Sequence, residues 1–335
     1  MYGARKSTVH HLTLKSFMLS GITKRVKILF LLTIITGAIA FWTTISKNTS
    51  GKPVYSDFVV IDTADIVKVA FTSLGETHFV SPKTSSVWFI DAKYDVRKDI
   101  ITTMKLGLAR MEVKMPVPSE LKEEIKKRLL TEGVHVEIQS EIGNTEFWVL
   151  TNDNDNNSSF FISAKDAEPY IIHVPGFTGD LTDLFKLKAA DWRNKALFRN
   201  VVGGIQEMSV AYHSSAKDGF TIQQEMGKYK VVDMPNADST RLYTYLSNFQ
   251  RVNMDSYLVG KQRDSVEFLL KTQQPEVVIT MVDNDKTRSK TIQIYKALPG
   301  NKILFARIVD NGELITLNPE HFIRILVRKQ WFMDK

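Results

Sequence analysis

The sequence predicts an α+β protein in which one N-terminal transmembrane helix precedes two tandem related repeats, each an antiparallel sheet covered by helices. Three observations predict this fold class. A long run without charge lies near the N-terminus, the pattern that begins at Asp65 returns at Gly204, and both copies contain hairpin signals. With 335 residues, 43% of them hydrophobic, the chain can fill two cores of ordinary size.

The transmembrane helix is predicted over residues 28–46, ILFLLTIITGAIAFWTTIS, where nineteen positions carry no charge. About 20 such residues cross the core of a bilayer as a helix. The preceding segment, residues 1–27, ends in KRVK, whereas the opposite flank begins with the single cation Lys47. The positive-inside rule therefore predicts that residues 1–27 are cytoplasmic, that the helix lies in the inner membrane and that the body is periplasmic.

Other interpretations of the N-terminus remain open. Ala38-Ile39-Ala40 also fits a signal-peptide cleavage site, although the apolar run continues beyond it. Met18 is an alternative start, because the residues before it are polar. Residues 1–25 are basic and free of acids, as in a mitochondrial presequence, but the following span is too hydrophobic for a simple one. With an anchor or a cleaved signal the body is exported, and only its tethering differs.

After the membrane helix, the body divides into four predicted segments. Residues 47–56, KNTSGKPVYS, are small and polar, which is typical of a linker. A first α+β repeat follows over 57–177, then a connecting segment over 178–198, and a second α+β repeat over 199–335.

Nearly constant offsets between the two repeats indicate a duplication. Ile66 precedes Ile205 by 139 residues, and Met111 precedes Phe249 by 138. We also pair Phe79 with Phe220, which is 141 residues further on. A repeat at a fixed period is the sequence signature of a duplicated structural unit.

Each repeat contains two predicted helices. In the first helix of each repeat, apolar side chains recur at helical spacing: Ile100, Met104, Leu108 and Met111, then Leu242, Tyr245, Leu246 and Phe249. Asp238 and Ser239 are candidates to cap the latter helix. The second helices are predicted around Leu121, Ile125 and Leu129 and around Val266, Leu269 and Leu270.

Hairpins follow the helices in both repeats. VHVEIQSEIGNTEFWVL is predicted to turn at Gly143-Asn144, and EVVITMVDNDKTRSKTIQIY at Asp283-Asn284-Asp285. We expect the helices to cover one face of each sheet. We also expect YIIHV, at 170–174, to hold the place in the first repeat that ILFARIV, from Ile303, holds in the second.

The charge distribution argues against a nucleic-acid partner. The net charge is +7, but eight of the 44 lysines and arginines lie in residues 1–52, which contain no acid, so 36 basic and 37 acidic residues remain. Phosphate binding needs a basic face, which this neutral body does not indicate. The chain has no cysteine, which excludes disulfides, thiolate metal sites and cysteine nucleophiles.

The sequence EPYIIHVPGF, followed by DWRNKALF at 191–198, occurs together with the two halves and the N-terminal span. In this combination the chain resembles the Domain of Unknown Function 4340 family in its Bacteroidota form, over about residues 55–330. The resemblance implies a membrane-anchored periplasmic protein. Some relatives are linked to ABC transporters of the gliding-motility type, so it also implies a permease and an ATPase as partners. The family has no agreed reaction, and this chain has no permease of its own.

Motifs for catalysis and cofactor binding are absent from the sequence. It contains no G-x-x-x-x-G-K-[ST], G-x-G-x-x-G, G-x-S-x-G or H-E-x-x-H. The seven histidines are scattered apart from His10 and His11, so we expect no cofactor, metal or catalytic residue. NDNDNNSS, from Asn152, resembles a calcium loop but has Ala164 where the distal glutamate belongs. We interpret it as a solvated loop.

The stretch AEPYIIHVPGFTGDL, residues 167–181, is predicted to be a structural junction. His173 alternates with apolar neighbours on a strand, where a structural role is favoured over a general base oriented by Asp180 or Asp191. Six residues form the predicted junction: Pro175, Gly176, Phe177, Asp191, Trp192 and Arg193. Arg193 is predicted to pair with an acid across the two halves, with ligand contact as the alternative.

These observations favour a non-catalytic interaction or scaffold module of a cell-envelope assembly or export system, with protein partners in the envelope. Duplicated sheets offer edges at which a partner strand can dock. The alternative is a periplasmic protein that binds a small ligand or glycan in the cleft between the halves, with Trp88, Trp148 and Trp192 as stacking platforms. A hydrolase centred on His173 is a third hypothesis.

Overall fold

The computed structural model describes residues 35–36, 62–84, 86–296 and 303–333. By its contacts the chain separates into two units, residues 1–56 and 57–335, and the second contains all the strands described below. Within the described residues, none of the helices has both the length and the apolar character needed to cross a membrane. The predicted span 28–46 lies outside the described residues, except for Ile35 and Thr36.

The first half of the body contains a nine-stranded sheet in which every pair of neighbouring strands is antiparallel. Its order is β4-β3-β2-β1-β6-β7-β8-β9-β5. The strands are β1 (Ile66–Ser73), β2 (Glu76–Thr84), β3 (Val87–Ile90), β4 (Tyr94–Asp95), β5 (Glu112–Pro116), β6 (Val134–Ser140), β7 (Gly143–Thr151), β8 (Ser159–Ile162) and β9 (Tyr170–His173).

The second half contains an eight-stranded antiparallel sheet of order β13-β12-β11-β16-β17-β18-β19-β15. Its strands are β11 (Ile205–Tyr212), β12 (Phe220–Glu225), β13 (Lys228–Val231), β15 (Ser256–Tyr257), β16 (Val277–Asp283), β17 (Lys290–Ile294), β18 (Leu304–Ile308) and β19 (Glu313–Leu317). A small separate pair is formed by β10 (Ala196–Phe198) and β14 (Val252–Asn253). The predicted α+β class is confirmed by these antiparallel sheets and their helices.

The two sheets have the same strand order from β3 to β5 and from β13 to β15, and β4 is an addition to the first. Their registers agree as well. Val69 pairs with Val80 and Ile138, and at the corresponding position Met208 pairs with Ile222 and Met281. In β1 and in β11, the pairing register also shifts just after the first residue of the strand.

Two of the predicted correspondences are wrong. Phe220 pairs with Val210, so its counterpart is His78, which pairs with Phe71; Phe79 lies one position further on. A shift of one residue moves a side chain to the other face of a sheet. Similarly, YIIHV forms β9, whose counterpart in the strand order is β19, whereas most of ILFARIV forms β18.

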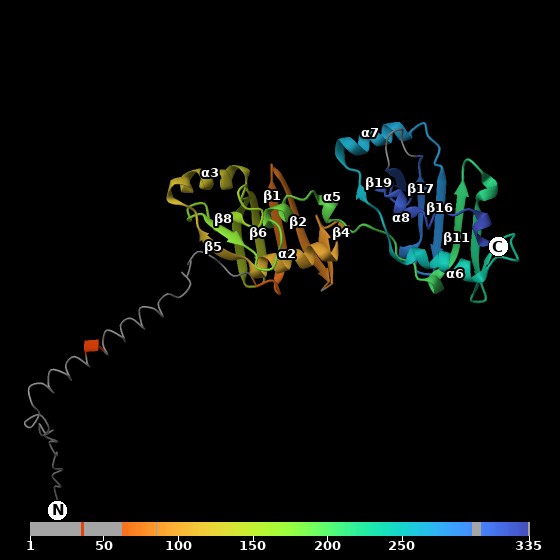
Figure 1. Cartoon of the computed structure of the whole chain (residues 1–335), viewed down its shortest axis with the longest axis horizontal. Helices are drawn as coiled ribbons and strands as arrows, with labels where there is room; N and C mark the ends of the chain where they lie inside the picture. Colours follow the sequence, from red (N-terminus) through yellow and green to blue (C-terminus); the bar gives the residue numbers. More distant parts are fainter. Residues whose placement is uncertain (1–34, 37–61, 85, 297–302, 334–335) are drawn as a thin grey trace, which may run out of the picture. The chain divides into compact units, whose positions relative to one another are not determined.

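The helices α2 (Lys98–Arg110) and α3 (Lys122–Glu132) pack on opposite faces of the first sheet (Figure 1). The alternation along β7 explains this arrangement, because Phe147 joins the core beneath α2 whereas Trp148 joins the core beneath α3. The expectation that helices cover only one face is therefore wrong.

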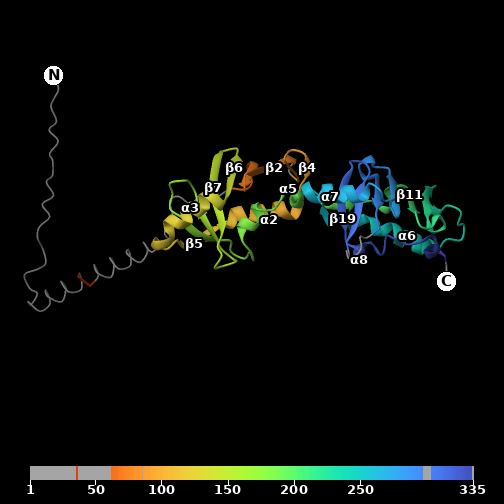
Figure 2. The same cartoon turned by 90° about the horizontal axis from the view of Figure 1, so that it is seen from above.

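The second sheet is covered in the same way by α6 (Ser239–Ser247) and α7 (Gly260–Leu270), as Figures 1 and 2 show. The larger core lies on the α6 side, where α8 (Pro319–Phe322) contributes Phe322. Asp238 caps α6 as predicted, since its carboxylate accepts hydrogen bonds from the backbone N–H groups of Thr240 and Arg241.

The hairpin between β6 and β7 turns at Glu141-Ile142, because Ser140 pairs with Gly143. The predicted turn at Gly143-Asn144 is wrong by two residues. In the second half Asn284 and Asp285 lie in the turn as predicted, whereas Asp283 is the last residue of β16. The turn also includes a short 3₁₀ helix, Lys286–Arg288.

The predicted connecting segment 178–198 is largely part of the first half. It contains α4 (Leu181–Phe185) and α5 (Ala189–Trp192), whose apolar side chains enter the core beneath α2. Only its end, at Leu197 and Phe198, belongs to the core of the second half.

Candidate functional site

The predicted junction begins with a tight turn after β9. The backbone N–H of Phe177 donates to the carbonyl of Val174 at 3.1 Å, and Gly176 has φ of +75°. A side chain at that φ would be strained, so glycine is favoured here. Phe177 is half-buried against the core of the first half, and Pro175 is exposed.

Trp192 lies at the centre of the first half rather than at a ligand site. Its side chain is fully buried, and its ring stacks on that of Phe71 with centroids 4.9 Å apart. Asp191, beside it, is partly buried, and its backbone N–H bonds to the carbonyl of Lys188. The contacts of Trp192 and Asp191 therefore lie within the fold.

Arg193 connects the two halves of the body. Its guanidinium carbon lies 3.6 Å from the ring centroid of Tyr94 on β4 and 3.5 Å from that of Tyr257 on β15. Its Nη2 also donates to Glu313 of β19 at 2.5 Å. A guanidinium between two aromatic faces with a carboxylate partner is a strong, directional contact. Arg193 thus pairs with an acid of the second half.

Burial of the Tyr257 phenol raises its pKa, and the positive charge of Arg193 opposes that rise. The Arg193 Nε, by contrast, is buried and has no hydrogen-bond partner. The junction is thus held by the ion pair and by stacking, and not by a fully satisfied hydrogen-bond network.

The candidate stacking platforms are not available to a ligand. Trp88, Trp148 and Trp192 are 5%, 6% and 0% exposed. The Trp148 ring is also covered by His135, with centroids 4.2 Å apart and planes inclined by 11°. Because stacking on a sugar needs an open ring face, the structure does not support these three residues as a glycan platform.

The three residues of the hydrolase hypothesis do not converge. His173 lies 3.3 Å from Glu112 on the neighbouring strand β5. Asp180 instead caps α4 through the N–H of Thr182, and its carboxylate accepts a hydrogen bond from Ser159. Both hydrogen bonds use Oδ1 of Asp180, and neither of them involves His173.

The acidic loop that resembles a calcium site is neutralised by basic side chains. Lys114 donates to Asp155 at 2.9 Å, and Arg128 donates to Asp153 at 3.1 Å. The hydrogen bond from Lys114 is the main cause of the lowering of the Asp155 pKa to about 2. These contacts support the interpretation of this segment as a structural loop.

A basic cavity lies in the second half, beside β14 and α8. Its volume is about 540 Å³, and its lining includes Arg251, His321 and Arg324 with one acid, Glu320. Neither arginine forms an ion pair with any residue that the structure describes. The sequence did not indicate this cavity, because its cations are dispersed over more than 70 positions of a neutral body.

The nearby Arg199 adds a positive charge beside the basic cavity. Its guanidinium donates only to neutral acceptors, two backbone carbonyls and the side chain of Asn253. Partial burial and repulsion by Arg251 together lower its pKa. This surface can attract an anionic group.

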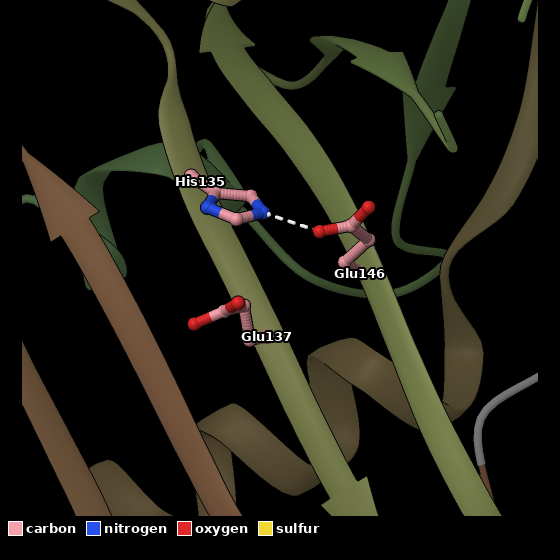
Figure 3. A group of neighbouring side chains, drawn as sticks. All are labelled: His135, Glu137 and Glu146. Carbon is pink, nitrogen blue, oxygen red and sulfur yellow. Dashed lines mark hydrogen bonds and ion pairs between the residues drawn. The ribbon is translucent and has the colours of Figure 1, made fainter. Parts of the chain in front are cut away.

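On the first sheet, His135, Glu137 and Glu146 form the one group of three in residues 62–84, 86–296 and 303–333 whose ligand atoms are close enough for a single metal ion (Figure 3). One ligand atom from each residue lies within 4.8 Å of the others. His135 Nε2 and a Glu146 oxygen are 2.9 Å apart. Sequence reasoning missed this group, although all three residues lie in the predicted hairpin.

The geometry defines a class of protein: mixed α+β, with two antiparallel sheets of common strand order, each carrying helices on both faces. The chain belongs to the family described as Domain of unknown function (DUF4340), whose model matches residues 88–309, more than half of the chain. The predicted family is thereby confirmed. Comparison with curated proteins and with solved structures finds no match.

Proposed function

We propose that the protein is a non-catalytic, inner-membrane-anchored periplasmic interaction module of a cell-envelope assembly or export system, whose body arose by duplication of one α+β unit. The basic cavity carries the proposal of an interaction. Arg251 and Arg324 have no ionic partner within the described part of the chain, and repulsion by Arg251 contributes to the lowered pKa of Arg199. Cations without ionic partners favour an acidic partner surface.

Sequence supports the anchor. The uncharged residues 28–46 suffice to span a bilayer, and the basic KRVK sequence before them favours a cytoplasmic N-terminus. The relation between the halves is supported by their common strand order and register. The junction at Arg193 holds such a body together while leaving the basic cavity open to a partner.

Co-purification from gently solubilised membranes tests the interaction. The wild-type chain should capture acidic envelope proteins in fixed ratio, and an ABC-type permease and ATPase are the candidates. A double variant, Arg251→Glu with Arg324→Glu, should lose them. Its matched control, Lys261→Glu with Arg263→Glu, changes the net charge equally on exposed α7 positions and should retain them. Equal capture by both variants would contradict the proposed site.

Topology has a separate test. A protease added to intact spheroplasts should digest the body but spare a tag placed before Met1, and the body should remain in the membrane fraction after a salt wash. Protection of the body from the protease would contradict the periplasmic location, and release into the soluble fraction would contradict the anchor.

A small anionic ligand is the second candidate, because the basic cavity has the volume of an ordinary ligand pocket. A ligand that binds only the native state raises the melting temperature. Screening anionic sugars and phosphorylated or carboxylated metabolites against the wild type and the Arg251→Glu, Arg324→Glu variant distinguishes this function from binding of a protein.

A further inference from the structure

Three side chains gather on the first sheet beside the region covered by α3: His135 and Glu137 on β6, and Glu146 on β7 (Figure 3). We propose that they bind a divalent transition-metal ion, for which Zn²⁺ is the probe. This proposal is independent of the proposed function, because it concerns the other half of the body.

The backbone places the three residues together. His135 and Glu137 are two positions apart on one strand, so their side chains share a face. Glu146 lies directly opposite Glu137 in the register of β6 and β7. With metal–ligand bonds of about 2.0–2.2 Å, the ligand atoms around one ion lie about 3–3.5 Å apart. The three ligand atoms here lie within 4.8 Å of one another, so small side-chain rotations bring them to that spacing. Glu137 and Glu146 are exposed and can make them.

The imidazole is held in place before any ion arrives. Its ring stacks on Trp148, which is directly across from it on β7 and is itself buried. Nε2 faces Glu146 at 2.9 Å. A fixed ring orientation favours metal binding, because less conformational freedom is lost when the ion binds.

The charges also favour a cation. Like charges directly opposite one another on neighbouring strands are destabilising, and Glu137 and Glu146 form such a pair. Within the described residues Glu137 has no ion pair. Lys68, which lines the same cavity, places its ammonium 4.4 Å from the ring centroid of Phe79 instead. A bound divalent ion converts this repulsion into attraction.

The second half shows that the fold does not require these charges. By strand order and register, the counterparts of Glu137 and Glu146 are Thr280 and Thr291, which face one another with hydroxyl oxygens 3.5 Å apart. Val278 takes the place of His135. A neutral pair is thus compatible with this position in the sheet, and the three ligands are particular to the first half.

The donor set indicates the kind of ion. One imidazole nitrogen and two carboxylates suit Zn²⁺ and neighbouring transition metals, whereas Mg²⁺ and Ca²⁺ favour oxygen-only sites. Three protein ligands leave further coordination positions. Both glutamates line a cavity of about 470 Å³. Its lining also includes Gln139 and Asn144, whose side-chain amides can hydrogen-bond to coordinated water.

Calorimetric titration of the full chain in detergent with Zn²⁺ tests the proposal. The chain should carry no polyhistidine tag, and His10 and His11 should be replaced by alanine, because adjacent imidazoles offer a competing site. One Zn²⁺ per chain is expected, since the second half has only neutral counterparts. His135→Ala, Glu137→Gln and Glu146→Gln should each weaken binding by at least about 10-fold.

His78→Ala is the matched control. His78 is also a strand histidine of the first sheet, with Asp91 at 2.9 Å and Glu76 at 3.9 Å, and its replacement should leave Zn²⁺ binding unchanged. Melting temperatures without metal show that each variant is folded. The proposal is overturned if the three ligand variants bind as tightly as the wild type, if His78→Ala weakens binding equally, or if Mg²⁺ binds as well as Zn²⁺.

Discussion

The two halves of the body share a strand order, but they differ in what that scaffold carries. At equivalent positions on two central strands, the first half has His135, Glu137 and Glu146, whereas the second has Val278, Thr280 and Thr291. The second half instead has the basic cavity. The same strand arrangement therefore tolerates charged, hydroxyl or apolar side chains at these positions. The functions of the two halves must be sought in the residues at which the halves differ.

The halves also differ in how they use aromatic residues. The core of the first half is centred on Trp192, which is supplied by the segment after the sheet. In the second half, buried tyrosines donate to backbone carbonyls: Tyr229 to Val202 and Ile205, and Tyr245 to Ile325. Substitutions and pH changes that exploit these contrasts should destabilise one half more than the other.

Trp192→Ala should have the largest effect and should be confined to the first half. Removing a fully buried indole costs about 3–5 kcal/mol of unfolding free energy, because a cavity remains beside Phe71. Amide hydrogen exchange should show faster opening of β1 and β6, with β11 and β16 nearly unchanged. An equal loss of protection in both sheets would show that the halves unfold as one unit.

Arg193→Ala should weaken the connection between the halves. Breaking a buried ion pair costs about 3–5 kcal/mol, but Glu313 keeps 21% of its side-chain exposure, so we expect about 2–3 kcal/mol. In calorimetry the variant should unfold in two separated transitions, whereas a more cooperative transition is expected of the wild type.

The control for the Arg193 variant is Arg128→Ala, which removes exposed ion pairs to Glu132 and Asp153. It should cost less than about 1 kcal/mol, as exposed pairs do. If both arginine variants lose equal stability, the buried position of Arg193 between the rings of Tyr94 and Tyr257 adds no measurable stability.

Alkaline pH should destabilise the second half selectively. Burial raises the pKa of Tyr212 to about 12 and that of Tyr245 well above its usual value. An unfolded tyrosine ionises near pH 10, so the stabilisation is fully present below pH 10 and is lost as the pH rises toward 12. For Tyr212 alone the loss is about 1–2 kcal/mol after allowance for its partial exposure.

Limited proteolysis between pH 9 and 12, with the cleavage sites mapped by mass spectrometry, checks this expectation. Cuts should appear first after residue 199. Tyr212→Phe should move their onset to higher pH, even though the Val327 carbonyl then loses its donor. Earlier cleavage in the first half would contradict the assignment.

The sequence predicted the helices and sheets well, because each depends on local periodicity. The apolar spacing of residues 100–111 and the Asp238 cap are local signals, and both agree with the structure. The sequence did not predict that helices cover both faces of each sheet. An apolar residue in a strand does not reveal which helix packs on its side of the sheet. Phe147 and Trp148 pack under different helices, and only the fold distinguishes them.

The metal-binding group was missed for a specific reason. A turn at Gly143-Asn144 would place Glu141 opposite Glu146, whereas the actual turn at Glu141-Ile142 places Glu137 there and brings His135 close. An error of two residues in a turn changed every cross-strand pair. The basic cavity was beyond sequence reasoning, because Arg251 and Arg324 come together only through tertiary packing.

The smallest expected effect concerns two hairpin tips, one in each half. Leu74-Gly75 joins β1 to β2 and Met226-Gly227 joins β12 to β13, and all four residues have positive φ. Such two-residue turns favour Asn-Gly, because leucine and methionine are strained at positive φ. Leu74→Asn and Met226→Asn should therefore each raise the free energy of unfolding by about 0.5–1 kcal/mol in chemical denaturation.

Gly75→Ala is the control for these hairpin variants, and it should be destabilising because φ is +82° there. Leu74 and Met226 are also exposed, so neither has packing to lose when it is replaced. If Leu74→Asn lowers stability while Met226→Asn raises it, turn preference does not determine stability at Leu74. Because the counterpart of the β1–β2 hairpin in the strand order is β11–β12, the two tips are not counterparts, and such a result would concern the Leu74 turn alone.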